Sequence, residues 1–80
     1  MIVHDEWNEC KLVRQAYDSR THIDDAICMF FVHGKYIVEV IRRYKEMPNQ
    51  ELDFRSRREF MDLIYANYYF EQLKENPLKR

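Results

Sequence analysis

Apolar residues recur at intervals of three or four along most of the chain, which is the spacing of α-helices that bury one face. Three segments show this pattern, at about residues 5–19, 22–47 and 56–75. The longest carries a heptad-like seam over three repeats, formed by Ile23, Ile27, Phe30, Gly34, Ile37, Ile41 and Tyr44. The pattern therefore predicts three helices, of which the second is long and central.

Residues that favour helix ends lie at the borders of these segments. Thr21 begins a sequence that resembles a capping box before the second segment, and Pro48 follows the end of that segment. Ser56 opens a capping box before the third segment, and Pro77 comes just after it. We therefore expect an all-α fold, a small antiparallel three-helix bundle in which residues 1–80 form a single helical domain.

One alternative concerns residues 27–41. The runs 27–32 and 36–41 are rich in β-branched and aromatic residues, and His33 and Gly34 between them could form a two-residue hairpin turn, giving an α+β fold. We favour the helix because the spacing of three and four continues through the supposed turn. A hairpin would also leave the capping residues at both ends without a role.

The third segment has two apolar faces, although a helix of a three-helix domain needs only one. One face carries Phe60, Met61, Ile64, Tyr65 and Tyr68, and the opposite face carries Leu63, Ala66, Phe70 and Leu73. A chain of 80 residues with 46% hydrophobic residues also has little interior for twelve aromatic side chains. We therefore predict a surface that binds a partner protein or a second copy in a homodimer, formed by Tyr65, Tyr68, Tyr69, Met61, Phe60 and Tyr36. The alternative is that both faces belong to a tight core.

Charge does not identify a partner class, because thirteen basic and fourteen acidic residues give a net charge of −1. A local exception is the cluster of Arg55, Arg57 and Arg58, placed at the positive end of a predicted helix dipole. We interpret it as neutralised by neighbouring acidic residues. If Arg42 and Arg43 lie alongside, the alternative is an edge that binds an anion or acidic partner, as in a nucleic-acid-binding transcriptional regulator.

The residues that carry catalysis or bind metals do not form a recognisable site. His22 and His33 are eleven residues apart, too far along one helix to share an ion, and Cys28 has no aligned base. A single glycine excludes a glycine-rich phosphate loop. We therefore expect no catalytic residue, no metal and no cofactor, and we expect that the protein is not an enzyme.

A short stretch from Gln50 to Asp53 resembles part of the Ser-Gln-Glu-Leu-Asp signature of small sporulation aspartyl-phosphate phosphatases. The resemblance covers four residues. Asn49 stands where that family has Ser, and Arg55 and Ser56 replace the apolar pair that follows the Asp. The resemblance would imply a phosphatase-type role for Asp53, but it is too short to assign the family.

The N-terminal residues contain no basic region followed by an apolar run, and no stretch approaches the length of a membrane span. Two cysteines without close spacing favour free thiols in a reducing compartment. We expect a cytoplasmic protein with no membrane partner. The function we predict is a non-enzymatic protein–protein interaction module, a small regulator or inhibitor that occupies a partner's surface and is itself homo-oligomeric.

Overall fold

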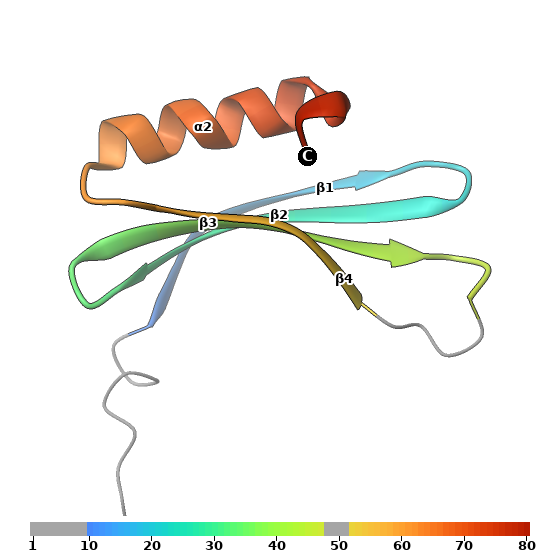
Figure 1. The fold of residues 1–80 in the computed structure, drawn as a ribbon, viewed down its shortest axis with the longest axis horizontal. Helices are drawn as coiled ribbons and strands as arrows, with labels where there is room; N and C mark the ends of the chain where they lie inside the picture. Colours follow the sequence, from blue (N-terminus) through green and yellow to red (C-terminus); the bar gives the residue numbers. More distant parts are fainter. Residues whose placement is uncertain (1–9, 48–51) are drawn as a thin grey trace, which may run out of the picture.

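The structure, a computed structural model, describes residues 10–47 and 52–80. Four long strands are followed by one helix and a short 3-10 turn (Figure 1). The elements are β1 (Lys11–Ser19), β2 (Ile23–Val32), β3 (Lys35–Tyr44), β4 (Leu52–Phe60), α2 (Leu63–Glu75) and η1 (Pro77–Lys79). The prediction of an all-α three-helix bundle is therefore wrong.

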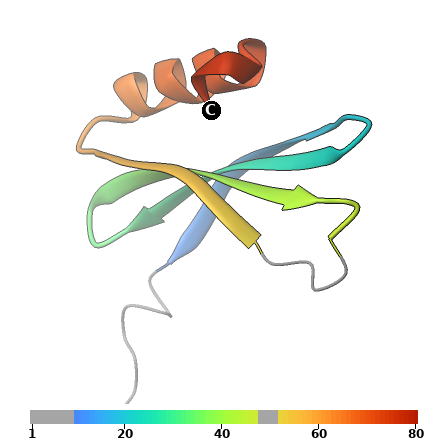
Figure 2. The same ribbon diagram turned by 45° about the vertical axis from the view of Figure 1, so that its right-hand side comes forward.

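The strands form one antiparallel sheet in the order β1-β2-β3-β4, so each strand pairs with its neighbour in the sequence. Helix α2 lies across one side of this sheet (Figures 1 and 2). No helix or strand of the described part of the chain lies on the other side. We call the two sides the helix face and the open face.

The long central helix predicted for residues 22–47 is replaced by the β2–β3 hairpin, which corresponds to the alternative for residues 27–41. Its turn is formed by His33 and Gly34, whose φ angles are 52° and 75°. Positive φ at both central positions matches the right-handed twist of the flanking strands. Val32 pairs with Lys35 directly across this turn.

The heptad-like seam was misleading because β2 and β3 carry apolar residues on both faces. Ile27 belongs to the helix face, whereas Phe30 and Ile37 pair with each other on the open face. The helical spacing therefore joined residues that point in opposite directions. Near-continuous apolar runs are compatible with either a buried helix or a strand, and periodicity alone does not separate them.

The other two predicted helices have different outcomes. Residues 5–9 of the first lie outside the described part of the chain, and the rest of that segment is β1. In the third, residues 56–60 belong to β4, and only Leu63–Glu75 is helical.

The N-cap of α2 is Asp62 rather than the predicted Ser56. The Oδ1 atom of Asp62 accepts a hydrogen bond of 2.8 Å from the backbone N–H of Ile64. Between the second and third predicted helices, residues 48–51 are outside the described part, and Leu52 begins β4.

The hydrophobic core lies between α2 and the two central strands. Its fully buried members are Ile27, Met29, Val38 and Val40 from the sheet and Ala66, Phe70 and Leu73 from the helix. Two arginines on the edge strands border this core. Arg14 of β1 stacks over the Phe70 ring at 4.1 Å and forms an ion pair of 2.6 Å with Glu71, and Arg58 of β4 lies 5.0 Å from the Tyr69 ring.

A buried carboxylate joins the sheet to the C-terminal end of α2. The side chain of Asp25 is fully buried and accepts hydrogen bonds from Arg42 at 2.8 Å, Arg20 at 2.9 Å and Arg80 at 2.9 Å. The Arg80 guanidinium, which is 2% exposed, also donates to the carbonyl of Leu73 at 2.7 Å. Among the described residues, no buried side-chain nitrogen or oxygen is left without a hydrogen-bond partner. The network thus compensates the buried charges and fixes the end of the helix.

We expect Asp25→Asn to lower the free energy of unfolding by about 3–5 kcal/mol at pH 7, because it leaves buried guanidinium groups uncompensated. Burial alone would raise the pKa of Asp25, but hydrogen bonds from Arg42 and Arg80 outweigh it and lower the pKa from 3.8 to about 2. A pKa that is lower in the folded state means that this stabilisation is complete above about pH 4 and is lost as the pH falls towards 2. Urea unfolding of both proteins between pH 7 and 2 measures the difference.

The control for this experiment is Asp53→Asn. Asp53 is partly exposed and pairs with Arg55 at 3.2 Å, so its replacement should cost less than about 1 kcal/mol. Equal losses in the two variants, or a loss in Asp25→Asn that does not shrink at low pH, would contradict the role given to Asp25.

Candidate protein-binding surfaces

Four large apolar side chains lie exposed at and beyond the start of α2. Met61 is 76% exposed, Ile64 75%, and Tyr65 and Tyr68 are each 66% exposed. Ile64, Tyr65 and Tyr68 lie on the side of α2 turned away from the core residues, and Met61 lies just before the N-cap of the helix. We call these four residues the outer helix surface. It contains three of the six residues predicted to bind a partner.

The other three predicted binding residues lie at the border of the core. Tyr36, Phe60 and Tyr69 are partly buried and pack against the core cluster. The Phe60 and Tyr69 rings are 5.4 Å apart, and Tyr36 stacks at 4.8 Å on Phe31. The structure therefore divides the predicted set, and only Met61, Tyr65 and Tyr68 stand clear of the sheet.

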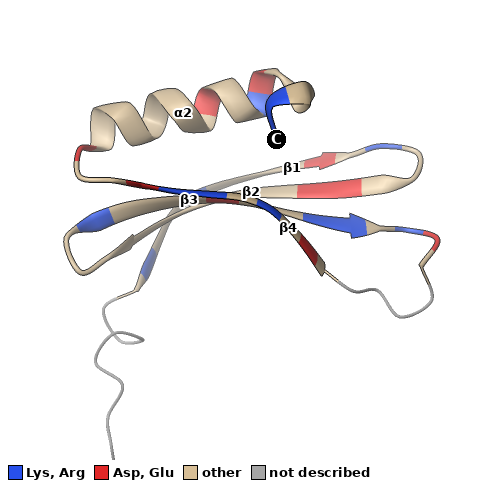
Figure 3. Cartoon of the chain, in the orientation of Figure 1, with Lys and Arg blue, Asp and Glu red and all other residues tan. Residues whose placement is uncertain are grey.

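The five arginines of the predicted anion-binding edge do not form one surface. Three of them pair with acidic residues on their own or a neighbouring strand: Arg43 with Asp24 at 2.8 Å, Arg55 with Asp53 at 3.2 Å and Arg57 with Glu39 at 3.5 Å. Arg42 is buried against Asp25, and Arg58 stacks on Tyr69. Acidic and basic residues are interspersed along the strands (Figure 3).

The open face of the sheet is a surface that the sequence analysis did not identify. Alternation along the strands and the pairing register place many apolar side chains on it. They are Leu12 and Tyr17 of β1, Ala26, Cys28 and Phe30 of β2, Ile37 and Ile41 of β3, and Leu52 and Phe54 of β4. The edge-strand members are the most exposed, with Tyr17 at 72% and Phe54 at 67%.

A bulge in each edge strand changes which residue of that strand lies on the open face. In β4 the register shifts between Ser56, which pairs with Val40, and Phe54, which pairs with Ile41, so that Arg55 is the extra residue. Without this shift, Phe54 would lie on the same face as Ser56, whose hydroxyl is 3.4 Å from that of Tyr69 on α2. In β1 an equivalent shift between residues 12 and 14 places Leu12 opposite Phe30. Bulges often serve to redirect side chains in this way.

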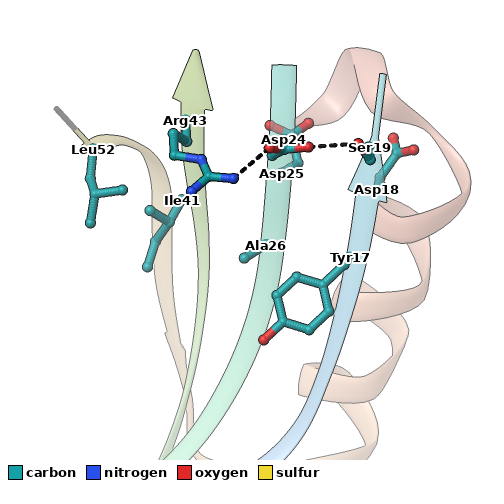
Figure 4. A pocket seen from close by; sticks show the side chains of 9 residues that line it. All are labelled: Tyr17, Asp18, Ser19, Asp24, Asp25, Ala26, Ile41, Arg43 and Leu52. Atoms are coloured by element: carbon teal, nitrogen blue, oxygen red, sulfur yellow. Dashed lines mark hydrogen bonds and ion pairs between the residues drawn. The ribbon is translucent and has the colours of Figure 1, made fainter. Parts of the chain in front are cut away.

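One end of the open face is hollowed. The hollow has a volume of about 340 Å³, and its apolar lining includes Tyr17, Ala26, Ile41 and Leu52. Figure 4 shows these side chains on the near side of the strands, with the helix behind them. The Arg43–Asp24 ion pair closes the end of the hollow. Most of its exposed lining is apolar, which suits an apolar group better than a charged substrate.

The carboxylate at this end is held in its charged form. Asp24 accepts hydrogen bonds of 2.6 Å from the Ser19 hydroxyl and 2.8 Å from Arg43. These two bonds, the Ser19 bond first, lower the pKa of Asp24 from 3.8 to about 2. The charge is already matched within the chain by Arg43 and by Lys45 at 3.5 Å. Asp24 is therefore a poor general base and has little need of an external cation.

The described residues offer no group of three or more His, Cys, Asp or Glu side chains that could hold a metal ion. Within the same residues, no helix is long and apolar enough to cross a membrane. Of the four-residue resemblance to the phosphatase signature, positions 50 and 51 lie outside the described residues. Asp53 lies in β4, where it accepts hydrogen bonds from Tyr44 and Arg55.

One signal in the sequence could have revealed the open face. The run from Ile27 to Val32 is apolar at every position, as is the run from Tyr36 to Val38. In strands, such runs place apolar residues on both sides of a sheet. The two bulges, in contrast, depend on pairing between strands and leave no pattern in the sequence.

Cys28 and Cys10 are both free thiols, and we expect them to react at very different rates. Cys28 lies in the middle of the open face and is 8% exposed, and burial followed by the nearby charge of Glu39 raises its pKa. Cys10 is exposed. A thiol reagent at pH 8 should modify Cys10 at least about tenfold faster than Cys28, as measured by mass spectrometry of the two peptides. Similar rates would show that the sheet centre is accessible to the reagent.

Comparison of the chain with known proteins gives no relative from which function could be transferred. No protein-family model, curated protein or solved structure matches it. The function must therefore be inferred from the two exposed apolar surfaces, the outer helix surface and the open face.

Proposed function

We propose that this protein is a non-enzymatic protein–protein interaction module, a small cytoplasmic regulator or inhibitor that is homo-oligomeric and acts by occupying the surface of a partner protein. The observation that carries this proposal is the outer helix surface. It presents four large apolar side chains, each at least 66% exposed, three of them on one short helix and the fourth, Met61, just before its N-cap. Exposed apolar patches on small domains are typical of sites for protein partners.

The residue types of the outer helix surface support binding to a protein groove. On α2, Tyr68 follows Ile64 and Tyr65 at intervals of four and three residues, a spacing found among the anchor residues of helices that bind in grooves, and Met61 lies just before the N-cap. Tyrosine combines a large apolar ring with a hydroxyl that can remain hydrated at the rim of an interface. Methionine adapts its shape to an uneven partner surface.

The opposite side of α2 holds the helix in place for such binding. Phe70 and Leu73 are fully buried in the core, and Arg14 contacts both Phe70 and Glu71 from β1. Arg80 is hydrogen bonded to the Leu73 carbonyl at the end of the helix. A helix that is fixed before binding loses less conformational entropy when a partner docks on it.

We do not extend the proposal to nucleic acids. Such a role would require the predicted arginines to face a phosphate backbone together, but Arg42 is buried against Asp25 and Arg43 and Arg57 pair with Asp24 and Glu39. Their charges are therefore largely matched within the chain, and few would release counterions on binding.

The double variant Tyr65→Ser/Tyr68→Ser should lose partner binding because it removes both aromatic anchors. In affinity capture from the source cells, quantified by mass spectrometry, we expect proteins retained by the unchanged chain to fall at least about tenfold. Circular dichroism should show no change in fold, since both side chains are 66% exposed.

The matched control is Leu78→Ser, which removes an apolar side chain that is 95% exposed but lies outside the outer helix surface. It should retain the same proteins as the unchanged chain. If the double variant also retains them fully, the outer helix surface is not the binding site.

A further inference from the structure

The two central strands have the composition of strands that are covered on both sides. An antiparallel sheet with one solvated face normally alternates apolar and polar residues along each strand. Here β2 places Ala26, Cys28 and Phe30 on the open face, and β3 places Ile37 and Ile41 there. Cys28 and Ile37 are already 8% and 7% exposed, shielded by their neighbours on the sheet. The composition indicates that another layer covers the open face.

The bulge of β4 points to the same conclusion independently. It brings Phe54, which is 67% exposed, to the open face in place of Arg55, and Leu12, which is 50% exposed, lies on the same face at the bulge of β1. Tyr17 and Leu52 add side chains that are 72% and 55% exposed. The apolar surface therefore extends from one edge of the sheet to the other.

The charges of the open face are matched within the face itself. Three ion pairs join neighbouring strands there: Asp24–Arg43 at 2.8 Å, Glu39–Arg57 at 3.5 Å and Lys35–Glu59 at 3.7 Å. Apart from Lys45, a second cation 3.5 Å from Asp24 at one end, these charges balance, so the face has no strong excess of either sign. A neutral, internally paired face can meet an identical face without like-charge repulsion, whereas it offers nothing to attract a strongly charged partner.

The size of the open face also fits a second copy of the chain. Four strands of nine or ten residues give a sheet with a projected area of about 600 Å². Projecting side chains raise the accessible area towards the roughly 800 Å² per partner of a standard stable interface. Two such sheets can pack face to face about 10 Å apart.

We propose that the open face is the interface of a homodimer, in which two copies pack sheet against sheet. This inference rests on the homo-oligomer of the proposed function and specifies where the copies meet. The dimer has two four-stranded sheets inside and the two α2 helices outside. Tyr17, Leu52 and Phe54 become buried, while the outer helix surface of each copy remains free for a partner.

The test is the solution mass by light scattering over a wide concentration range, with matched variants on the two sides of the molecule. The unchanged chain should have twice the mass of one 10.0 kDa chain. Phe54→Glu and, as a milder change, Tyr17→Ser should each weaken dimerisation, the first by at least about a hundredfold because each change occurs twice in the interface. Ile64→Glu and Tyr65→Ser alter residues of similar exposure on the outer helix surface and should leave the dimer intact.

Hydroxyl-radical footprinting of the unchanged chain gives a readout that does not depend on whether a variant folds. At high concentration, oxidation of Tyr17 and Phe54 should fall relative to the dilute protein, while oxidation of Tyr65 and Tyr68 should stay constant.

Several outcomes would overturn the dimer. The first is a monomer at all concentrations. The second is a dimer that is lost in Ile64→Glu or Tyr65→Ser. The third is a dimer that persists in Phe54→Glu while footprinting of the unchanged chain shows no protection of Tyr17. A monomer that still captures partners through Tyr65 and Tyr68 would remove the dimer but leave partner binding standing. A dimer that captures no partner would remove partner binding but leave the dimer standing.

Discussion

One short helix has to cover a sheet of four strands, and this constraint determines what the described structure can bury. The thirteen residues of α2 supply three fully buried side chains, Ala66, Phe70 and Leu73, which pack on the two central strands. The side chains on the open face lie on the other side of the sheet, so α2 cannot cover them. The packing of α2 therefore creates a core on one side and exposes an apolar face on the other.

Charged residues hold the helix at three places around that core. Arg14 and Arg58 approach it from the two edge strands and stack on Phe70 and Tyr69. At its C-terminal end the Asp25 network joins β2 and β3 to Arg80. Arginine suits this role because its long stem covers apolar surface while its planar head stacks and forms several hydrogen bonds. Of the arginines that look like a basic cluster in the sequence, Arg58 therefore serves the packing of the helix, whereas Arg43, Arg55 and Arg57 pair with acidic residues of the sheet.

The outer helix surface and the open face lie on opposite sides of the molecule, so one can be used without blocking the other. In the proposed dimer the open faces meet, and the two outer helix surfaces point away from each other. Such an arrangement would present two identical sites and could raise the apparent affinity for a partner that has two binding sites itself. Self-association would then depend on residues such as Phe54, and partner binding on other residues, such as Tyr65.

The sequence by itself determined that residues 63–75 are helical and that Ala66, Phe70 and Leu73 share one side, because a helical period depends only on neighbours along the chain. It wrongly extended this helix back to residue 56, and it left open whether the other apolar side is also buried. That period also singled out Met61, Tyr65 and Tyr68. It could not distinguish a helix from a hairpin at residues 27–41, where every position of β2 from Ile27 to Val32 is apolar. Only the tertiary structure decided the pairing of the strands, the bulge at Arg55 that turns Phe54 outwards and the partners of each arginine. These features depend on contacts between residues far apart in the sequence, which local spacing does not record.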